Sequence, residues 1–196
     1  MSSLRRVCVF CGSSMGFSPA YAEAAAELGK LLAQRGIGLV YGGAHVGTMG
    51  VIADAVLAAG GDVVGVIPRT LQEKEVAHQS LTELHVVESM HERKLAMMDR
   101  ADAFVTLPGG SGTLEELFET FTWLQLGLHH KPIGLLDVNG YWSGLLTFLD
   151  HVVDQRLLRR EHADMLLVAR EPAELLDRFE AWEPPRVAKW IDRDTA

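Results

Sequence analysis

Short apolar segments alternate with longer stretches of helical periodicity along most of the chain. Six segments are expected to form strands, and they span residues 6–11, 37–41, 62–67, 84–87, 103–107 and 132–136. Most of them lack the alternation of polar and apolar residues that a half-exposed strand shows, which is typical of strands covered on both faces. This pattern predicts an α/β fold in which right-handed crossovers place helices on both faces of a mainly parallel, doubly wound sheet.

The helical stretches are identified by apolar residues that recur at three- and four-residue spacing. In the clearest case, Ser18 is placed to cap a helix that begins at Pro19 and ends at Gly36. Further helices are expected over residues 48–59, 90–101, 114–128, 141–154 and 172–181. We therefore expect a single Rossmann-like domain over residues 1–182, followed by a C-terminal tail over residues 183–196.

Length and charge limit the classes of protein to which the chain can belong. Its 196 residues suffice for one domain but not for two of ordinary size. The 18 Lys and Arg residues against 26 Asp and Glu residues give a formal charge of −8, which disfavours nucleic acid and anionic membranes as partners. No apolar run reaches the roughly 18 residues of a membrane span, and the N-terminus lacks the pattern of a signal peptide. A cytoplasmic protein is therefore expected.

Cysteine and histidine residues do not indicate a metal centre. Cys8 and Cys11 lie on an expected strand, where residues three apart point to opposite faces, so we expect two core cysteines rather than a ligand pair or a disulfide. The eight histidines lack the spacing typical of a helical zinc site. Neither a metal nor another cofactor is expected.

Three glycine-rich loops follow expected strands, at residues 12–16, 42–50 and 108–116. In a doubly wound sheet, ligands bind at the carboxyl ends of the strands. Glycine lets backbone N–H groups approach an anion closely, and a helix N-terminus favours negative charge. None of the loops has the sequence of a nucleotide-triphosphate P-loop, and the first lacks the dinucleotide spacing G-x-G-x-x-G. A tight turn explains any one loop, whereas three at one edge favour a ligand that carries phosphate.

Carboxylates follow the third loop, because Glu115, Glu116 and Glu119 lie off the apolar stripe of the helix that begins there. Acidic residues in a first turn often do no more than complement the helix dipole. A carboxylate beside an anion site would repel its ligand, however. Such a carboxylate is tolerated where it must face a developing positive charge or activate water.

A basic pair, Arg93 and Lys94, follows Ser89 and Glu92, which fit a capping box at the start of another helix. The pair is either a solvated surface feature or part of the same edge of the sheet. At that edge, an arginine could hold a planar or anionic group through two hydrogen bonds.

Two of these motifs together resemble those of a known enzyme family. Pro-Gly-Gly-x-Gly-Thr-x-x-Glu spans residues 108–116, and Met-His-x-Arg-Lys spans residues 90–94. The pair resembles the LOG (LONELY GUY) family of cytokinin-activating phosphoribohydrolases, whose members are often labelled "possible lysine decarboxylase". The resemblance covers roughly residues 5–180. The decarboxylase label is not supported, since no lysine has a recognisable pyridoxal-phosphate setting.

The resemblance implies hydrolysis of the N-glycosidic bond in an N6-substituted adenosine 5′-monophosphate, which releases the free base and ribose 5-phosphate. By motif position, Arg93 and Glu116 match the catalytic pair of the family. The positions that match its substrate contacts are Glu75, Lys94, Gly110, Ser111, Gly112, Thr113, Leu114, Glu115 and Thr122. The Glu116 carboxylate could stabilise positive charge at C1′ or activate water. Arg93 could orient the ribose, orient Glu116 or stabilise the departing base.

Two other functions stay open at this point. One is a broader nucleosidase that acts on AMP and other purine 5′-monophosphates, and the other is a non-catalytic protein that binds a nucleotide or the molybdenum cofactor. The pairing of Arg93 with Glu116 argues against a pure carrier. The resemblance also implies a homodimer, and apolar residues of one helix are expected to supply exposed surface for it: Phe118, Phe121, Trp123 and Leu124.

Overall fold

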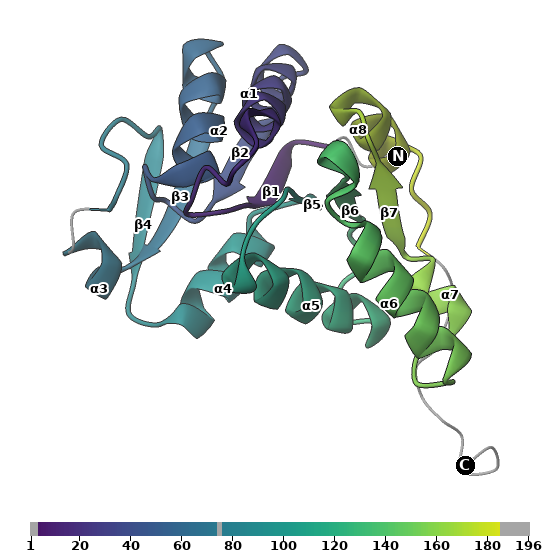
Figure 1. The fold of residues 1–196 in the computed structure, drawn as a ribbon. Coiled ribbons are helices and arrows are strands. Elements are labelled where there is room, and N and C mark those ends of the chain that lie inside the picture. Colours follow the sequence, from purple (N-terminus) through teal and green to yellow (C-terminus); the bar gives the residue numbers. More distant parts are fainter. Residues whose placement is uncertain (1–3, 74–75, 185–196) are drawn as a thin grey trace.

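The described strands form one parallel sheet of seven strands (Figure 1). The computed structural model describes residues 4–73 and 76–184. The strands are β1 (Arg6–Phe10), β2 (Gly38–Tyr41), β3 (Val63–Pro68), β4 (Glu83–Val87), β5 (Ala103–Thr106), β6 (Ile133–Leu136) and β7 (Leu166–Ala169). Their order is β4-β3-β2-β1-β5-β6-β7, and every neighbouring pair is parallel. The predicted doubly wound parallel sheet is confirmed.

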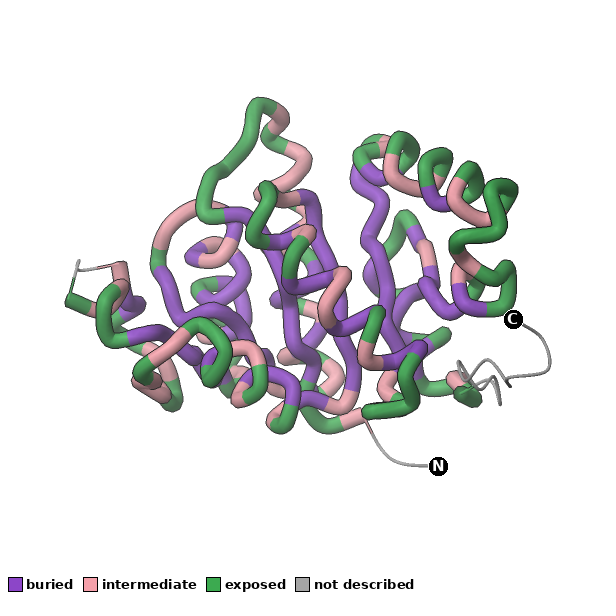
Figure 2. Tube along the Cα trace, turned by 90° about the horizontal axis from the view of Figure 1, so that it is seen from below, coloured by how far each residue is buried: buried purple, intermediate pink, exposed green. Residues whose placement is uncertain are grey.

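Helices cover both faces of this sheet (Figure 1). They are α1 (Pro19–Gln34), α2 (Gly47–Ala58), α3 (Arg69–Gln72), α4 (Met90–Asp99), α5 (Ser111–Gln125), the 3₁₀ helix η1 (Val138–Gly140), α6 (Ser143–Asp154), α7 (Arg160–Ala163) and α8 (Pro172–Glu180). Helices α1, α2 and α8 pack on one face, while α4, α5 and α6 pack on the other. Figure 2 shows buried residues along the strands and exposed residues on the outer turns of the helices.

The first helix forms as its sequence predicts. The Ser18 hydroxyl accepts a hydrogen bond from the Ala20 N–H at 3.3 Å, and Pro19 is the first helical residue. Gly36 has a φ of +69°, a left-handed conformation that glycine adopts without steric cost and that ends the helix. Leu28 and Leu32 belong to the core cluster on this face of the sheet.

The strand β7 and the short elements α3, η1 and α7 have no counterpart among the predicted elements. The segment of β7 lies in a short apolar run, residues 165–169, and a run of this length does not by itself separate a strand from a buried turn. It becomes a strand because it pairs with β6 along its whole length. Of the expected C-terminal tail, residues 185–196 lie outside the described residues.

Both cysteines are buried and free, on opposite faces of the sheet, as predicted. Cys8 packs in the cluster with α4 and α5, and Cys11 packs in the cluster with α1 and α2. Over the described ranges, no helix is long and apolar enough to cross a membrane. The same ranges contain no group of three or more His, Cys, Asp or Glu residues able to hold a metal ion.

The strand order changes direction between β1 and β5, and this reversal positions the candidate site. After β1 the chain enters α1 on one face of the sheet, and after β5 it enters α5 on the other. The two loops diverge from neighbouring strands, and such a divergence creates a crevice at the carboxyl edge of the sheet. The first and third glycine-rich loops therefore border one crevice.

Candidate active site

A cavity of about 400 Å³ lies at the carboxyl edge of the sheet, within the size range of small-molecule sites. The loop between β2 and α2 forms one side, α4 contributes Arg93 and Met97, and α5 contributes Thr113, Glu116 and the residues before them. A second cavity of about 270 Å³ lies beside it and is lined by the loop after β1, by the loop before α5, and by Tyr141. The two cavities share Ser13 and Gly110.

Glu116 is the carboxylate that reaches the larger cavity, from the second turn of α5. The residue is buried, with 9% of its surface exposed. Burial raises the pKa of the Glu116 carboxyl to about 7, because loss of water disfavours the charged form; Arg93 partly opposes this shift. The group is therefore able to change its protonation state near neutral pH, as groups in active sites often do.

Arg93 faces Glu116 from the first turns of α4, and it is also buried, with 8% of its surface exposed. Its Nη1 atom lies 3.7 Å from Glu116 Oε1. Its Nε donates a hydrogen bond to the Val66 carbonyl at 3.2 Å, and its Nη2 donates to the Gly42 carbonyl at 3.3 Å. Of the two interpretations left open for Arg93, the structure therefore supports a place at the edge of the sheet.

Gly42 is required for this position of Arg93. A Cβ atom at Gly42 would overlap with Nη2 of Arg93, so no other residue fits there without moving the guanidinium. The glycine-rich loop after β2 therefore has a role that its sequence does not reveal. It makes room for the arginine and supplies the carbonyl that holds it.

The N-terminus of α5 borders both cavities and has no side-chain cap. Its N-cap residue is Gly110, which has no side chain to accept a hydrogen bond from the first N–H groups of the helix. The hydroxyl of Thr113 donates to the Cys11 carbonyl at 3.0 Å, which ties this helix end to the loop after β1. Such uncovered N–H groups at a helix N-terminus suit an anionic group.

Lys94 lies outside the two cavities and is held by carboxylates of α5. Its Nζ donates to Glu115 and, at 3.0 Å, to Glu119. Among the described residues that line the cavities, Lys94, Leu114, Glu115 and Thr122 do not appear. Their assignment to substrate binding stays a prediction.

Five other predicted positions line a cavity, and their part in binding or catalysis stays a prediction. Gly110, Ser111, Gly112 and Thr113 line the larger cavity together with Glu116. Glu75 lies outside the described residues. Ser89 caps α4 by accepting from the Glu92 N–H at 3.1 Å, but Glu92 accepts from the Glu88 N–H at 2.9 Å rather than from that of Ser89, so the capping box is shifted by one residue.

Sequence reasoning missed several residues that line the cavities, namely Val46, Met49, Leu71, Val76 and Tyr141. Val46 and Met49 lie in or directly after a loop that the glycine pattern singled out, so their proximity to a ligand could have been expected. Leu71, Val76 and Tyr141 carry no comparable signal. They reach the cavities because the fold brings their segments to the same edge.

Comparisons with known proteins identify the family to which the chain is similar. A family model described as "Possible lysine decarboxylase" matches residues 49–179. Over 183 residues, the chain is 49% identical to the cytokinin riboside 5′-monophosphate phosphoribohydrolase LOG7 of Arabidopsis thaliana, covering 93% of this chain and 84% of the relative. It is 48% identical to LOGL6 of Oryza sativa subsp. japonica, described as a probable cytokinin riboside 5′-monophosphate phosphoribohydrolase. That match covers 93% of this chain and 73% of the relative.

Solved structures with a similar fold include proteins of another kind. The molybdenum cofactor carrier protein of Chlamydomonas reinhardtii has a TM-score of 0.67 at 20% identity, with 92% of this chain and 100% of that chain covered. The molybdenum cofactor binding protein of Rippkaea orientalis has a TM-score of 0.69 at 19% identity, with 92% and 98% covered. At this level of identity, the likeness shows a shared fold alone.

The raised pKa of Glu116 predicts how stability depends on pH. Between about 4.5 and about 7, the folded protein holds a proton on Glu116 that the unfolded chain has lost, so this group makes the free energy of unfolding fall as pH rises. Glu116→Gln cannot titrate. We expect its melting temperature, relative to that of the wild type, to rise between pH 5 and pH 8.

The control for this measurement is Glu115→Gln, which makes the same chemical change one residue earlier on an exposed side chain. Calorimetry of the three proteins at both pH values should show the relative rise for Glu116→Gln only. If the melting temperatures of Glu116→Gln and the wild type differed by the same amount at both pH values, the raised pKa of Glu116 would be contradicted.

Proposed function

The chain belongs to the LOG family of cytokinin riboside 5′-monophosphate phosphoribohydrolases, and from this premise we propose that it hydrolyses N6-substituted adenosine 5′-monophosphates. The products are the free base and ribose 5-phosphate. The observation that carries the proposal is the buried carboxyl of Glu116, 3.7 Å from Arg93 in a cavity that the N-terminus of α5 borders. A carboxylate, a cation and an anion site thus meet in a space large enough for a nucleotide.

In the proposed reaction, the N–H groups at the start of α5 bind the 5′-phosphate. The ribose then extends along α5 toward Glu116, one turn further on. As the bond between C1′ and N9 breaks, its electron pair leaves with the base, and C1′ becomes positive. The ionised carboxylate of Glu116 stabilises that charge in a site from which water is largely excluded. A water molecule supplies the oxygen that forms the new bond at C1′. One of its protons neutralises the departing base, which carries the electron pair of the broken bond.

Arg93 acts in this scheme by holding Glu116 and by offering positive charge. Two carbonyl groups, of Val66 and Gly42, fix its guanidinium, so it enters the reaction without reorganisation. Val46, Met49 and Leu71 line the cavity with apolar side chains, which suit an apolar substituent on N6 of the base. The described lining includes no lysine that could form a Schiff base, as pyridoxal-phosphate chemistry requires.

We also propose that the protein is a cytoplasmic homodimer. The exposed apolar residues that favour a dimer differ from those that the sequence suggested. Phe121 and Leu124 are buried in the core, so they are not the exposed residues that were expected, and Phe118 and Trp123 are only half-buried. The surface on this side instead exposes Leu128 after α5 and Phe148 of α6. Apolar side chains of this size favour association with a second copy.

Glu116→Gln is expected to lower kcat by roughly 10²-fold or more, the scale of losing one electrostatic stabiliser of a transition state. Gln keeps the size of the side chain but not its charge, so binding of AMP should persist or tighten. The matched control is Glu115→Gln, about 100° around the helix, which should change kcat much less. Chromatography of released base gives the rates. Base release by Glu116→Gln near the wild-type rate would show that another group stabilises C1′.

Dependence on the phosphate is the second expectation. If the start of α5 binds the phosphate and thereby holds C1′ against Glu116, isopentenyladenosine 5′-monophosphate should exceed isopentenyladenosine in kcat as well as in affinity. Equal kcat/KM values for the two would remove the phosphate site from the mechanism. AMP, measured alongside, tests the N6 preference: a rate equal to that of the isopentenyl nucleotide would instead mean a general purine nucleotide nucleosidase.

The homodimer predicts a mass in solution of twice the 21.5 kDa of one chain. Light scattering at micromolar concentration measures this mass directly. Replacing Phe148 by a charged residue provides a second test, because the exposed ring is not needed for the fold of one chain. A wild-type mass near 21.5 kDa would refute the dimer.

A further inference from the structure

The connection between β6 and α6 is held in an unusual conformation by several interactions. Asn139 and Gly140 have φ angles of +54° and +73°, and the first of these is uncommon for a residue with a side chain. The Asp137 carboxylate accepts from the Trp142 N–H at 2.9 Å, and the buried Trp142 indole donates to the Leu136 carbonyl at 3.2 Å. A strained turn that its surroundings fix in this way often serves a function.

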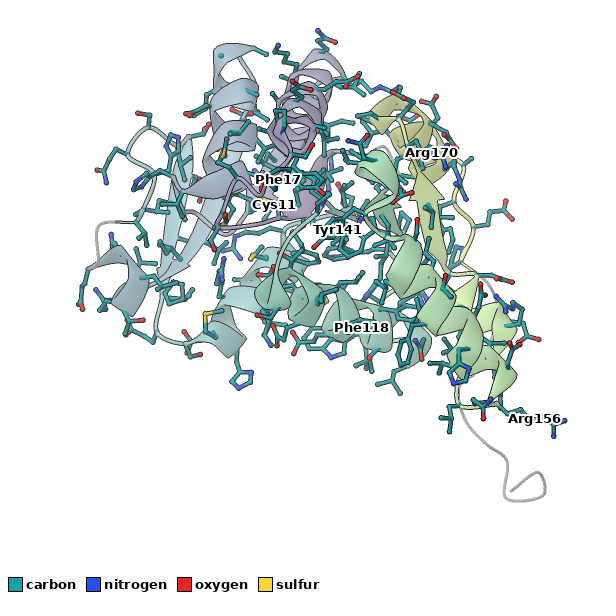
Figure 3. The ribbon with its side chains drawn as sticks, viewed as in Figure 1. Cys11, Phe17, Phe118, Tyr141, Arg156 and Arg170 are labelled. Carbon is teal, nitrogen blue, oxygen red and sulfur yellow. The ribbon has the colours of Figure 1, made fainter. Side chains whose placement is uncertain are left out.

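Tyr141 follows this turn directly. Its ring meets those of Tyr21 and Trp142 edge to face, with centroids 5.6 and 4.8 Å apart. Its hydroxyl donates a hydrogen bond of 2.6 Å to the Gly109 carbonyl, 32 residues earlier in the chain. Figure 3 shows Tyr141 between α5 and the loop that carries Cys11 and Phe17, and 40% of the residue is exposed. Tyr141 also lines the smaller cavity.

The carbonyl that Tyr141 binds belongs to the peptide group that leads into α5. In a trans peptide, the C=O and N–H bonds point in opposite directions, so holding the Gly109 carbonyl toward Tyr141 turns the Gly110 N–H away from it. Gly110 has open space where a side chain would be, and neither residue has a Cβ to restrict rotation. Without the hydroxyl, this peptide group is able to rotate and to turn a carbonyl oxygen where the N–H had been.

We propose that Tyr141 is a positioning residue for the phosphate site at the start of α5. Its hydroxyl holds the Gly109–Gly110 peptide group in the orientation that presents an N–H, rather than a carbonyl oxygen, to an anion. The inference rests on the proposed function for the identity of the ligand, a sugar 5′-phosphate. Tyr141 itself touches the loop and not the reacting atoms. Loss of its hydroxyl weakens the phosphate site without removing it, so at saturating substrate the phosphate still holds C1′ and the effect falls on binding rather than on cleavage of the glycosidic bond.

The hydroxyl can be tested apart from the ring, since Tyr141→Phe keeps the contacts with Tyr21 and Trp142. Tyr41→Phe is the matched control: Tyr41 is buried outside both cavities, and its hydroxyl has no hydrogen-bond partner among the described residues. Calorimetric titration with ribose 5-phosphate, which the enzyme does not consume, should show a dissociation constant about three- to tenfold higher for Tyr141→Phe, the range of one lost hydrogen bond. Tyr41→Phe should bind like the wild type.

Kinetics provide the readout that a purely structural role would not produce. With isopentenyladenosine 5′-monophosphate, Tyr141→Phe should raise KM by a similar factor and leave kcat within about twofold. Wild-type affinity of Tyr141→Phe for ribose 5-phosphate, or an equal loss in Tyr41→Phe, would overturn the proposal. The proposed function is tested separately. If the wild type binds ribose 5-phosphate but releases no base, the proposed function is wrong. The titration still decides whether Tyr141 contributes to binding.

Discussion

The reversal of strand order between β1 and β5 is the constraint on which the rest of this site depends. A parallel sheet brings the carboxyl ends of all its strands to one edge, and the reversal opens a crevice at that edge. Gly42, Arg93 and Glu116 lie in separate segments of the chain, yet the crevice unites them. The chemistry thus follows from topology first, because no two of these residues are close enough in sequence to meet by local structure.

The burial of Glu116 is the main electrostatic cost of this arrangement. Arg93 offsets only part of it, because the guanidinium lies 3.7 Å away and gives two of its hydrogen bonds to backbone carbonyls. The carboxyl therefore loses more from the absence of water than it gains from its partner, as its raised pKa shows. A site of this kind is stabilised by a ligand that develops positive charge beside the carboxylate, which is what the proposed ribosyl transition state provides.

Hydroxyl groups give the glycine-rich loops their shape. Thr48 both donates to and accepts from the backbone of Gly12, Thr113 binds the Cys11 carbonyl, and Tyr141 binds the Gly109 carbonyl. Glycine permits the close approach of backbone to ligand, but it leaves the loop without steric restraint. Hydrogen bonds from neighbouring elements supply the restraint that the glycines lack, so that the cavities are formed before a ligand arrives.

Most of the fold could be predicted from the sequence, because the periods of strands and helices are local properties that each segment displays separately. Six of the seven strands, the parallel sheet, the capped first helix and the opposite directions of Cys8 and Cys11 follow from such patterns. The resemblance of two motifs to those of the LOG family also implied that Arg93 and Glu116 act as a pair. The strand β7 was not predicted because a short apolar run is ambiguous by itself, and pairing with β6 defines this one as a strand.

Only the tertiary structure decided how the predicted side chains are used. Adjacent in sequence, Arg93 and Lys94 diverge, because successive residues on a helix face different directions: Arg93 enters the cavity, and Lys94 pairs with Glu115 and Glu119. The pKa of Glu116 and the hydrogen bond from Tyr141 to Gly109 arise in the same way. Burial and hydrogen bonding depend on which distant segments the fold brings together, and a local sequence pattern does not specify those contacts.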